Sequence, residues 1–290
     1  MSLFDQVVSE ALSHQKDLAP LRSVVEKELL HHDILRVLSG AGLLAKLTFM
    51  GGTCLRACYG SNRLSEDLDF TGGGDFSSKT LSAMGETLVC SLQAKYGLPV
   101  EISEPRREEG NVDTWKIKVQ TRPARKDIPA QRINIDVCSI PSYQRRPMML
   151  INPYGVDMGT SGLIVQAESR EEIFADKLVA FALRPNRIKN RDLWDMAWLR
   201  QQSIQLPFEL VPQKLNDHHC DPVKFLDLLA QRQAMLTADP AVMKDFQTEM
   251  RRFLPSERVK QTVDQPDFWL YLSTFVGDLS RQVGAVFRHV

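Results

Sequence analysis

The sequence lacks the features that mark several specialised classes of protein. No apolar run reaches the roughly 18 residues that a membrane-spanning helix needs, and acids and amides occupy the first residues, where a secretory signal would be apolar. The five cysteines are an odd number, widely scattered and without a C-x-x-C pair, which argues against a disulfide framework and a zinc cluster. A reducing cytoplasm is therefore the expected location.

The chain also lacks any bias of charge. Its 36 Lys and Arg residues equal its 36 Asp and Glu residues, so no overall positive field exists of the kind that a nucleic-acid-coating protein carries. Any contact with nucleic acid must then be local. Hydrophobic residues make up 43% and charged residues 25%, and with 290 residues this composition favours an ordinary globular protein of one large or two modest domains.

Common catalytic motifs are absent as well. The sequence contains no P-loop, Rossmann glycine fingerprint, H-E-x-x-H or G-x-S-x-G. Residues 218–221 place metal-ligand types in a row, but adjacent residues rarely converge on one ion and no second cluster accompanies them. The cysteines have no compelling local partner, so buried structural thiols are the better expectation.

The hydrophobic pattern predicts an α+β fold. Helical spacing opens the chain, at Leu21, Val24, Val25, Glu28, Leu29, His32 and Leu35. Residues 46–60 then pass from a short strand through a Gly-Gly turn into a helix, LSEDLDF follows as a strand, and further strands are expected between residues 100 and 149. Ser169 and Glu172 have the spacing of a capping box, which predicts a helix to about Arg184 and helices from there on.

Acidic residues are concentrated on one predicted strand. Side chains two residues apart on a strand share a face, so Ser65, Asp67 and Asp69 are expected to point the same way. Neighbouring carboxylates repel each other unless a cation lies between them, and oxygen ligands favour Mg²⁺ or Mn²⁺ over zinc. The alternation in RINIDVC makes Asp136 a candidate third carboxylate on a neighbouring strand. Alone, however, D-x-D is a common feature of a solvated strand face.

The residues upstream make a catalytic interpretation more specific. Gly51, Gly52 and Thr53 lie at the predicted strand-to-helix junction, where backbone N–H groups and a helix N-terminus can hold a triphosphate. A glycine pair by itself is usually only a turn. Together with the basic residue Arg63 and the paired acids, it forms a phosphate and metal site within a short stretch of sequence.

Two blocks of the sequence resemble a known family. GGTCLRACYGSNRLSEDLDF, at residues 51–70, is similar to the signature of the DNA-polymerase-beta-like nucleotidyltransferase superfamily, and its R-x-S-E-D-L-D-F string more narrowly resembles the AbiEii/AbiGii toxins of type IV toxin–antitoxin and phage-defence systems. Residues 171–199 resemble that family's downstream motifs, with Lys177 followed by R-D-x-x-D at Arg191, Asp192 and Asp195. The two blocks cover roughly a fifth of the chain.

The resemblance implies the activity and the partners. It implies transfer of a nucleotide monophosphate from an NTP, with Mg²⁺ or Mn²⁺, to the hydroxyl of an RNA acceptor such as a tRNA 3′ end. Growth arrest would follow, and a separately encoded antitoxin would counteract the toxin. A small-molecule nucleotidyltransferase of the antibiotic-modifying kind and a non-catalytic nucleotide-binding or interaction module are the alternatives.

The second block also has a reading from helical spacing alone. Ile173, Phe174, Lys177, Leu178 and Phe181 share one helix face, which places Lys177 on an inward row. The side chain either extends its ammonium to the edge or, as the resemblance implies, contacts nucleotide phosphates and is compensated by Asp192. The two downstream acids, alternatively, are helix N-terminal charges after an Asn190 cap.

These inferences give a nucleotidyltransferase domain over residues 1–165, with its N-terminal helices and a mixed sheet flanked by helices. A helical C-terminal domain over residues 166–290 contributes Lys177 and Asp192 to the site. In the AbiEii-like toxins the downstream lysine and aspartate take precedence over a third carboxylate, so Asp136 ranks below Asp192. The predicted site residues are catalytic Asp67, Asp69, Lys177 and Asp192; nucleotide-binding Gly51, Gly52, Thr53, Arg63, Ser65 and Lys177; and metal-binding Asp67, Asp69 and Asp136.

Basic residues form three local clusters in the sequence. Such clusters are usually solvated loops, but an RNA acceptor would place its backbone along them. The clusters are Arg122, Arg125, Lys126 and Arg132; Arg145 and Arg146; and Arg184, Arg187, Lys189 and Arg191.

Overall fold

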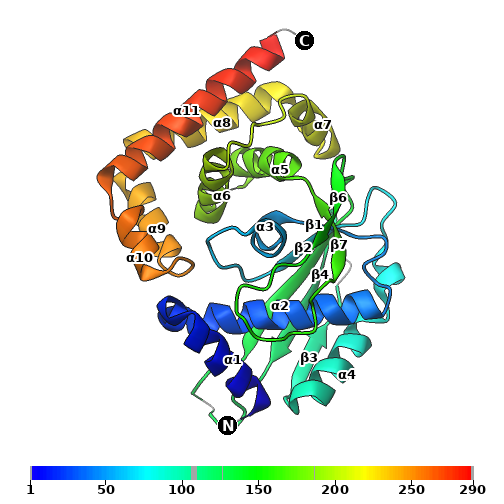
Figure 1. The fold of residues 1–290 in the computed structure, drawn as a ribbon. Coiled ribbons are helices and arrows are strands. Elements are labelled where there is room, and N and C mark those ends of the chain that lie inside the picture. The colour runs from blue at the N-terminus through cyan, green and yellow to red at the C-terminus, as the bar shows by residue number, and fades with distance from the viewer. Residues whose placement is uncertain (1, 106–109, 126, 186, 289–290) are drawn as a thin grey trace. The chain divides into compact units, whose positions relative to one another are not determined.

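The computed structural model describes residues 2–105, 110–125, 127–185 and 187–288. It divides into two compact units, Met1–Glu168 and Ser169–Val290. The first unit holds the sheet and the second is helical, so the predicted α+β class is confirmed (Figure 1). Among the described residues, no helix is both long and apolar enough to cross a membrane.

A mixed seven-stranded sheet forms the centre of the described first unit, in the order β3-β4-β5-β2-β1-β7-β6. Strand β2 pairs in parallel with β5, and β1 in parallel with β7; the remaining neighbours are antiparallel. The strands are β1 Thr48–Met50, β2 Leu68–Thr71, β3 Val100–Ser103, β4 Val112–Val119, β5 Gln131–Cys138, β6 Arg145–Met149 and β7 Ile164–Glu168. The sequence analysis missed β7, whose five residues run directly into the predicted helix after Ser169.

Helices pack on this sheet through apolar side chains. α2 crosses the sheet and packs against β5 and α4, whereas α3 packs against β1, β2 and β7 (Figure 1). Buried rings such as Phe49 and Phe70, stacked with centroids 5.1 Å apart, hold β1 to β2. The helices of this unit are α1 Leu3–His14, α2 Arg22–Gly40, α3 Gly51–Tyr59 and α4 Met84–Tyr96, with short 3₁₀ segments at Lys16–Leu21 and Ser78–Leu81.

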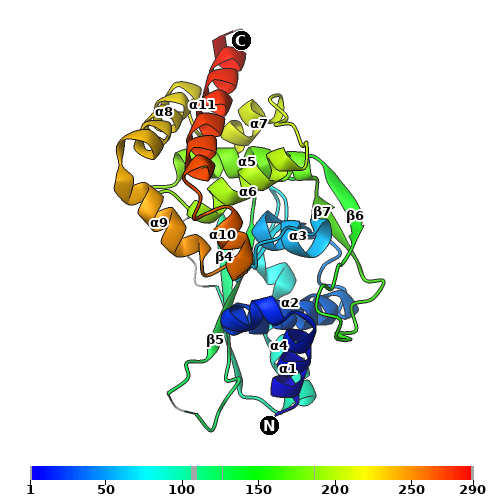
Figure 2. The same cartoon turned by 60° about the vertical axis from the view of Figure 1, so that its left-hand side comes forward.

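The second unit consists, in its described residues, of helices with conventional start signals. The Ser169 side chain accepts the Glu172 N–H at 3.0 Å, which confirms Ser169 as the N-cap and the predicted helix start, and prolines stand at the first positions of α8 and α9. The long α11 packs against α8 (Figure 2). The helices are α5 Arg170–Leu183, α6 Asn190–Gln201, α7 Leu210–Asp217, α8 Pro222–Ala238, α9 Pro240–Met250, α10 Ser256–Gln261 and α11 Pro266–Arg288.

Helix α2 carries two buried histidines that are neutral in the folded protein. His31 Nε2 lies 2.9 Å from the Glu66 carbonyl oxygen and therefore donates, and His32 Nδ1 lies 3.1 Å from Thr160 Oγ1. Burial lowers the pKa of each from 6.5 to about 4, outweighing the opposing effect of Glu28 on His31 and of Asp33 on His32.

The lowered pKa values of His31 and His32 predict that the folded state loses stability in acid. Unfolded histidines take up protons near pH 6.5 but folded ones only near pH 4, so the stabilisation is fully present above about pH 6.5 and is lost as the pH falls through 4. The loss should reach up to about 3 kcal/mol for each histidine. Urea unfolding between pH 7.5 and 4 measures this loss of stability. His32→Gln should make the free energy of unfolding depend less on pH. A free energy of unfolding that is constant across this range would contradict the prediction.

Candidate active site

The Gly-Gly turn joins β1 to α3 next to an acidic side chain. Gly51 opens α3 with φ of +75°, and a Cβ built on it would lie 2.6 Å from Asp69 Oδ2. Glycine is required here both for the left-handed backbone and for the close approach of the carboxylate. The negative charge of Asp69 therefore lies beside the first turn of a helix, where exposed N–H groups favour anions.

Asp69 and Asp136 are direct neighbours in the sheet. The parallel register pairs Asp69 with Asp136, and the adjacent antiparallel registers add Met50 on one side and Thr114 on the other. Paired residues share a sheet face. Both acids are partly exposed, and Thr114 Oγ1 donates a hydrogen bond to Asp136 Oδ1 at 2.6 Å. The prediction that Asp136 lies on a strand next to the D-x-D acids is confirmed.

Asp67 does not lie on the strand. β2 begins only at Leu68, so the expectation that Ser65, Asp67 and Asp69 alternate along one strand is wrong. The Asp67 Oδ1 atom instead accepts the Asn134 N–H at 3.0 Å, at the point where β5 runs beside the segment leading into β2. Its other oxygen, Oδ2, makes no hydrogen bond to any residue that the structure describes. The pairing of β2 with β5 begins only at Leu68 and Ile135, so one position earlier the Asn134 N–H donates to the Asp67 side chain.

Three predicted nucleotide-binding side chains are buried in internal contacts. Thr53 Oγ1 donates to Ser65 Oγ at 2.7 Å and also lies close to the Asp67 carbonyl oxygen. Arg63 is 2% exposed, and its guanidinium covers Gly52, where an added Cβ would lie 2.0 Å from Nη2. These contacts of Thr53, Ser65 and Arg63 fix the shape of the turn, to which Gly51 and Gly52 contribute only backbone atoms. Their contact with a nucleotide stays a prediction.

The residues of the first unit fit a hard divalent cation. Asp69 and Asp136 are in register, Asp67 precedes Asp69 by two residues, and all three are partly exposed carboxylates. Oxygen donors of this kind suit Mg²⁺ or Mn²⁺. The Asp69 carboxylate itself packs against the backbone of Gly51, where a Cβ would clash with it. Asp67, Asp69 and Asp136 do not form one of the described groups of three acids whose ligand atoms all lie within 4.8 Å of one another, so their joint binding of a metal stays a prediction.

Gly51→Ala should cost more stability than Gly60→Ala. Both glycines have φ near +70°, so each replacement costs about 1 kcal/mol from backbone strain, but nothing lies within 4 Å of a Cβ on Gly60. The clash with Asp69 should add about 1–2 kcal/mol to Gly51→Ala alone. Urea unfolding measures both values, and most of the excess should vanish in an Asp69→Ala background. Equal costs for the two glycines would show that the carboxylate does not press on Gly51.

Lys177 lies in a buried cluster of the second unit. Its side chain is 9% exposed, and Nζ lies 2.6 Å from Asp192 Oδ1 and 3.1 Å from Asp195 Oδ2. Burial alone would raise the pKa of Asp192, but the Lys177 ammonium, with Lys189 and Arg184 nearby, lowers it to about 2. The ion pair expected between Lys177 and Asp192 is therefore present. The alternative, in which the lysine extends its ammonium to the edge, is wrong.

The alternative reading of the downstream acids is only partly right. Asp192 does lie in the first turn of α6, where a negative charge is favourable. Asn190, however, is not the cap: α6 begins at Asn190 itself, and its side-chain amide donates to Asp245 Oδ2 at 2.8 Å and Glu249 Oε2 at 3.0 Å. Because Asp192 and Asp195 both contact Lys177, ion pairing rather than capping explains the burial of these two acids.

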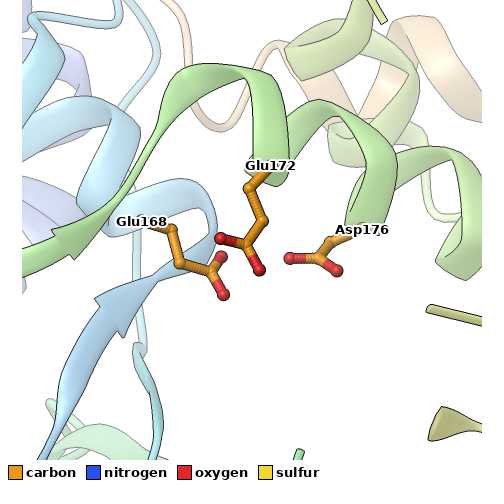
Figure 3. Close-up of side chains that lie close together, drawn as sticks. All are labelled: Glu168, Glu172 and Asp176. Atoms are coloured by element: carbon orange, nitrogen blue, oxygen red, sulfur yellow. The ribbon is translucent and has the colours of Figure 1, made fainter. Parts of the chain in front are cut away.

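Lys214 makes a second buried lysine cluster, which the sequence analysis missed. Figure 3 shows Glu172 and Asp176 on neighbouring turns of α5, with Glu168 at the end of β7. Glu168 closes the first unit, whereas Lys214 of α7 belongs with α5 to the second and lies 2.6 Å from Glu172 Oε1 and 2.9 Å from Asp176 Oδ1. One ammonium thus contacts both acids and offsets part of their negative charge, which favours a structural ion cluster between α5 and α7 over a metal site. The sequence signal that could have revealed this cluster was a charged residue, Lys214, at an inward position of a helix.

Lys214→Met should destabilise the protein strongly. It leaves the Glu172 and Asp176 carboxylates without the ammonium that contacts both, and removing one partner of a buried ion pair typically costs about 3–5 kcal/mol. Lys224→Met, at an exposed position of α8, is the matched control and should change stability by less than about 0.5 kcal/mol. Chemical denaturation of both variants is the measurement. Similar values for the two would refute the cluster's stabilising role.

The remaining sequence candidates are structural in the described part of the chain. Residues 218–221 form the turn before α8, in which Asp221 caps the helix by accepting the Lys224 N–H at 3.0 Å. Cys54 and Cys58 are buried, as expected, and burial, with the nearby Cys58, raises the pKa of the Cys54 thiol well above its usual value. The expectation of buried thiols is wrong for Cys90, which is exposed, and Cys138 and Cys220 are partly exposed.

The residues of the three basic clusters differ in their ion pairs and in their exposure. Arg122 pairs with Asp5 and Glu26, Arg125 with Asp127, and Arg191 with Glu249. Arg132, Arg145, Arg146 and Arg187 are exposed, and Lys126 lies outside the described residues. The exposed arginines, Arg125 among them, place positive charge where a polyanionic partner can reach it.

The fold and this acidic site define a nucleotidyltransferase-type protein, and comparison with known proteins narrows the class. A family model described as nucleotidyl transferase AbiEii toxin, type IV TA system, matches residues 33–274, and the chain therefore belongs to this family of nucleotidyltransferase toxins. The family predicted from the sequence motifs is confirmed. No curated protein gives a significant match.

Two solved structures are similar to this chain, and the first of them supports the fold. MenT4, a nucleotidyltransferase toxin from Mycobacterium tuberculosis H37Rv, is similar with a TM-score of 0.50 and 19% identity, covering 81% of this chain and 72% of that one. JHP933 from Helicobacter pylori has a TM-score of 0.49 and 17% identity, covering 92% of this chain and 95% of that one.

Proposed function

We propose that this chain transfers a nucleotidyl group from an NTP to an acceptor hydroxyl, with Mg²⁺ or Mn²⁺ held by Asp69, Asp136 and Asp67. The observation that carries the proposal is the direct register of Asp69 with Asp136, beside the turn at Gly51. Two partly exposed carboxylates kept together at a helix N-terminus repel each other, and a divalent cation relieves that repulsion.

The chain's own residues account for binding and orientation. The N–H groups in the first turn of α3 are the proposed phosphate-binding groups, because a helix N-terminus favours anions. Gly51 and Gly52 are themselves buried, and the Arg63 guanidinium covers Gly52, which places a positive charge beside this turn. A metal held by these carboxylates would supply positive charge for the acceptor oxygen and the leaving pyrophosphate. In the second unit, Lys177 is oriented by Asp192, and the family motif supports a role in which it offsets negative charge on the phosphates.

The acceptor that best fits the family is an RNA, and we propose a tRNA 3′ end. A toxin that blocks such ends would stop growth in the cytoplasm, with a cognate antitoxin as its partner and phage defence as one use. Membership of the family of nucleotidyltransferase toxins supports this role. The exposed side chains of Arg145, Arg146 and Arg187 supply positive charge for an RNA backbone.

Incubating the protein with labelled NTPs, Mg²⁺ and total tRNA tests the proposed acceptor directly. Labelled tRNA is the expected result. Label on an aminoglycoside instead would make the protein a small-molecule nucleotidyltransferase, and NTP binding without transfer to either acceptor would make it a non-catalytic module.

Asp69→Ala should lower the transfer rate by at least about 100-fold, because it removes a metal ligand at the centre of the proposed site. Asp75→Ala, at an exposed acid beyond the same strand, is the matched control and should transfer at the parent rate. Chelation with EDTA should abolish transfer by the parent and by the control, and added Mg²⁺ should restore it. An Asp69→Ala protein that still arrested growth at the parent rate would contradict the assignment.

A further inference from the structure

The segment between α3 and β2 is buried but has no regular secondary structure. Residues 60–67 form neither helix nor strand, yet Ser61, Arg63 and Ser65 are at most 5% exposed. Buried backbone groups outside regular structure need partners elsewhere. This segment ends at Asp67 and leads directly into Asp69, so its partners decide where two of the proposed metal ligands lie.

Helix α2 supplies three of the contacts of the segment's second half. Lys27 Nζ lies 2.8 Å from Glu66 Oε1, and His31 Nε2 donates to the Glu66 carbonyl oxygen at 2.9 Å. Glu28 Oε1 accepts the backbone N–H of Ser65 at 2.8 Å. Three residues on one side of α2 therefore contact Ser65 and Glu66, the two residues that precede Asp67.

Glu28 also reaches the first half of the segment, through Arg56. The second carboxylate oxygen of Glu28 accepts from Arg56 Nε at 3.1 Å and from the Tyr154 hydroxyl, while Arg56 Nη1 donates to the Ser61 carbonyl oxygen at 2.9 Å. Burial, followed by the nearby Glu28 charge, raises the pKa of Tyr154 well above its usual value, so the phenol keeps its proton and donates. One carboxylate, 4% exposed, thereby connects both ends of residues 61–65.

We infer that Glu28 is a positioning residue for the transfer reaction: it anchors residues 61–67 so that Asp67 lies beside β5 and Asp69 enters β2 in register with Asp136. This inference rests on the proposed function and extends it to α2. Glu28 precedes the residues 33–274 that match the family model, so the match assigns it no role. Because its own contacts are with Ser65, Arg56 and Tyr154, it acts through the segment rather than on the reacting atoms.

The same helix offers a matched control. Glu26 is 1% exposed and, like Glu28, is a buried acid in ion pairs, but its partners are Arg22, Arg122 and Gln131. None of these contacts involves residues 61–67. A general cost of disturbing a buried charge on α2 should therefore affect variants of Glu26 and Glu28 alike, whereas loss of positioning should affect Glu28 alone.

The test compares Glu28→Ala, Glu28→Gln and Glu26→Ala. Amide hydrogen exchange of the metal-free proteins should show at least about tenfold faster exchange across residues 60–67 in Glu28→Ala, and less than about twofold change in Glu26→Ala. The Mg²⁺ concentration for half-maximal transfer should rise about tenfold in Glu28→Ala. Glu28→Gln, which keeps an oxygen to accept the Ser65 N–H, should stay within about threefold of the parent on both measures.

Each other outcome counts against the inference. Unchanged exchange in Glu28→Ala, or equal changes in Glu28→Ala and Glu26→Ala, would show that Glu28 is merely a buried structural charge. If Glu28→Ala does not fold, Glu28→Asp keeps the charge but withdraws the carboxylate from Ser65, and it should give the same faster exchange. A parent protein that transfers no nucleotide would refute the proposed function, while the exchange measurement still decides whether Glu28 anchors the segment.

Discussion

The close approach of the Asp69 carboxylate to the first turn of α3 constrains much of the first unit. It requires a residue without a Cβ at Gly51, and it requires β1 and β2 to pair in the register that sets Met50 opposite Asp69. The parallel pairing of β2 with β5 then brings Asp136 to the other side of Asp69. The proposed phosphate-binding backbone and the proposed metal ligands are thus adjacent because a short strand and a short helix share one junction.

Buried charges do a large part of the positioning in both units. In the first, acids on α2 hold other elements in place: Asp33 binds Lys95 and Tyr96 of α4, and Glu28 binds the segment before Asp67. In the second, Lys177 and Lys214 each bind two acids. Such pairs add little net stability compared with apolar packing, but breaking them is costly, so they fix one arrangement of the elements against others.

The two buried lysines are chemically alike but differ in what surrounds them in sequence. Both are nearly inaccessible and both contact two carboxylates. Lys177 belongs to a block that resembles the family's downstream motifs, whereas Lys214 lies outside it. Burial and ion pairing alone therefore do not separate a proposed catalytic lysine from a structural one, and the family motif supplies the distinction.

The sequence by itself determined the elements whose signals are local. The Ser169 N-cap, the alternation of β5 and the glycine turn between β1 and α3 depend on residues a few positions apart, and motif spacing identified the family. Only the tertiary structure decided how Asp67 is oriented, that Asp69 and Asp136 are in register, and which partners Glu28 and Lys214 have. Those contacts join residues far apart in the chain, and pairing between strands and the burial of charge depend on the whole fold rather than on neighbouring residues.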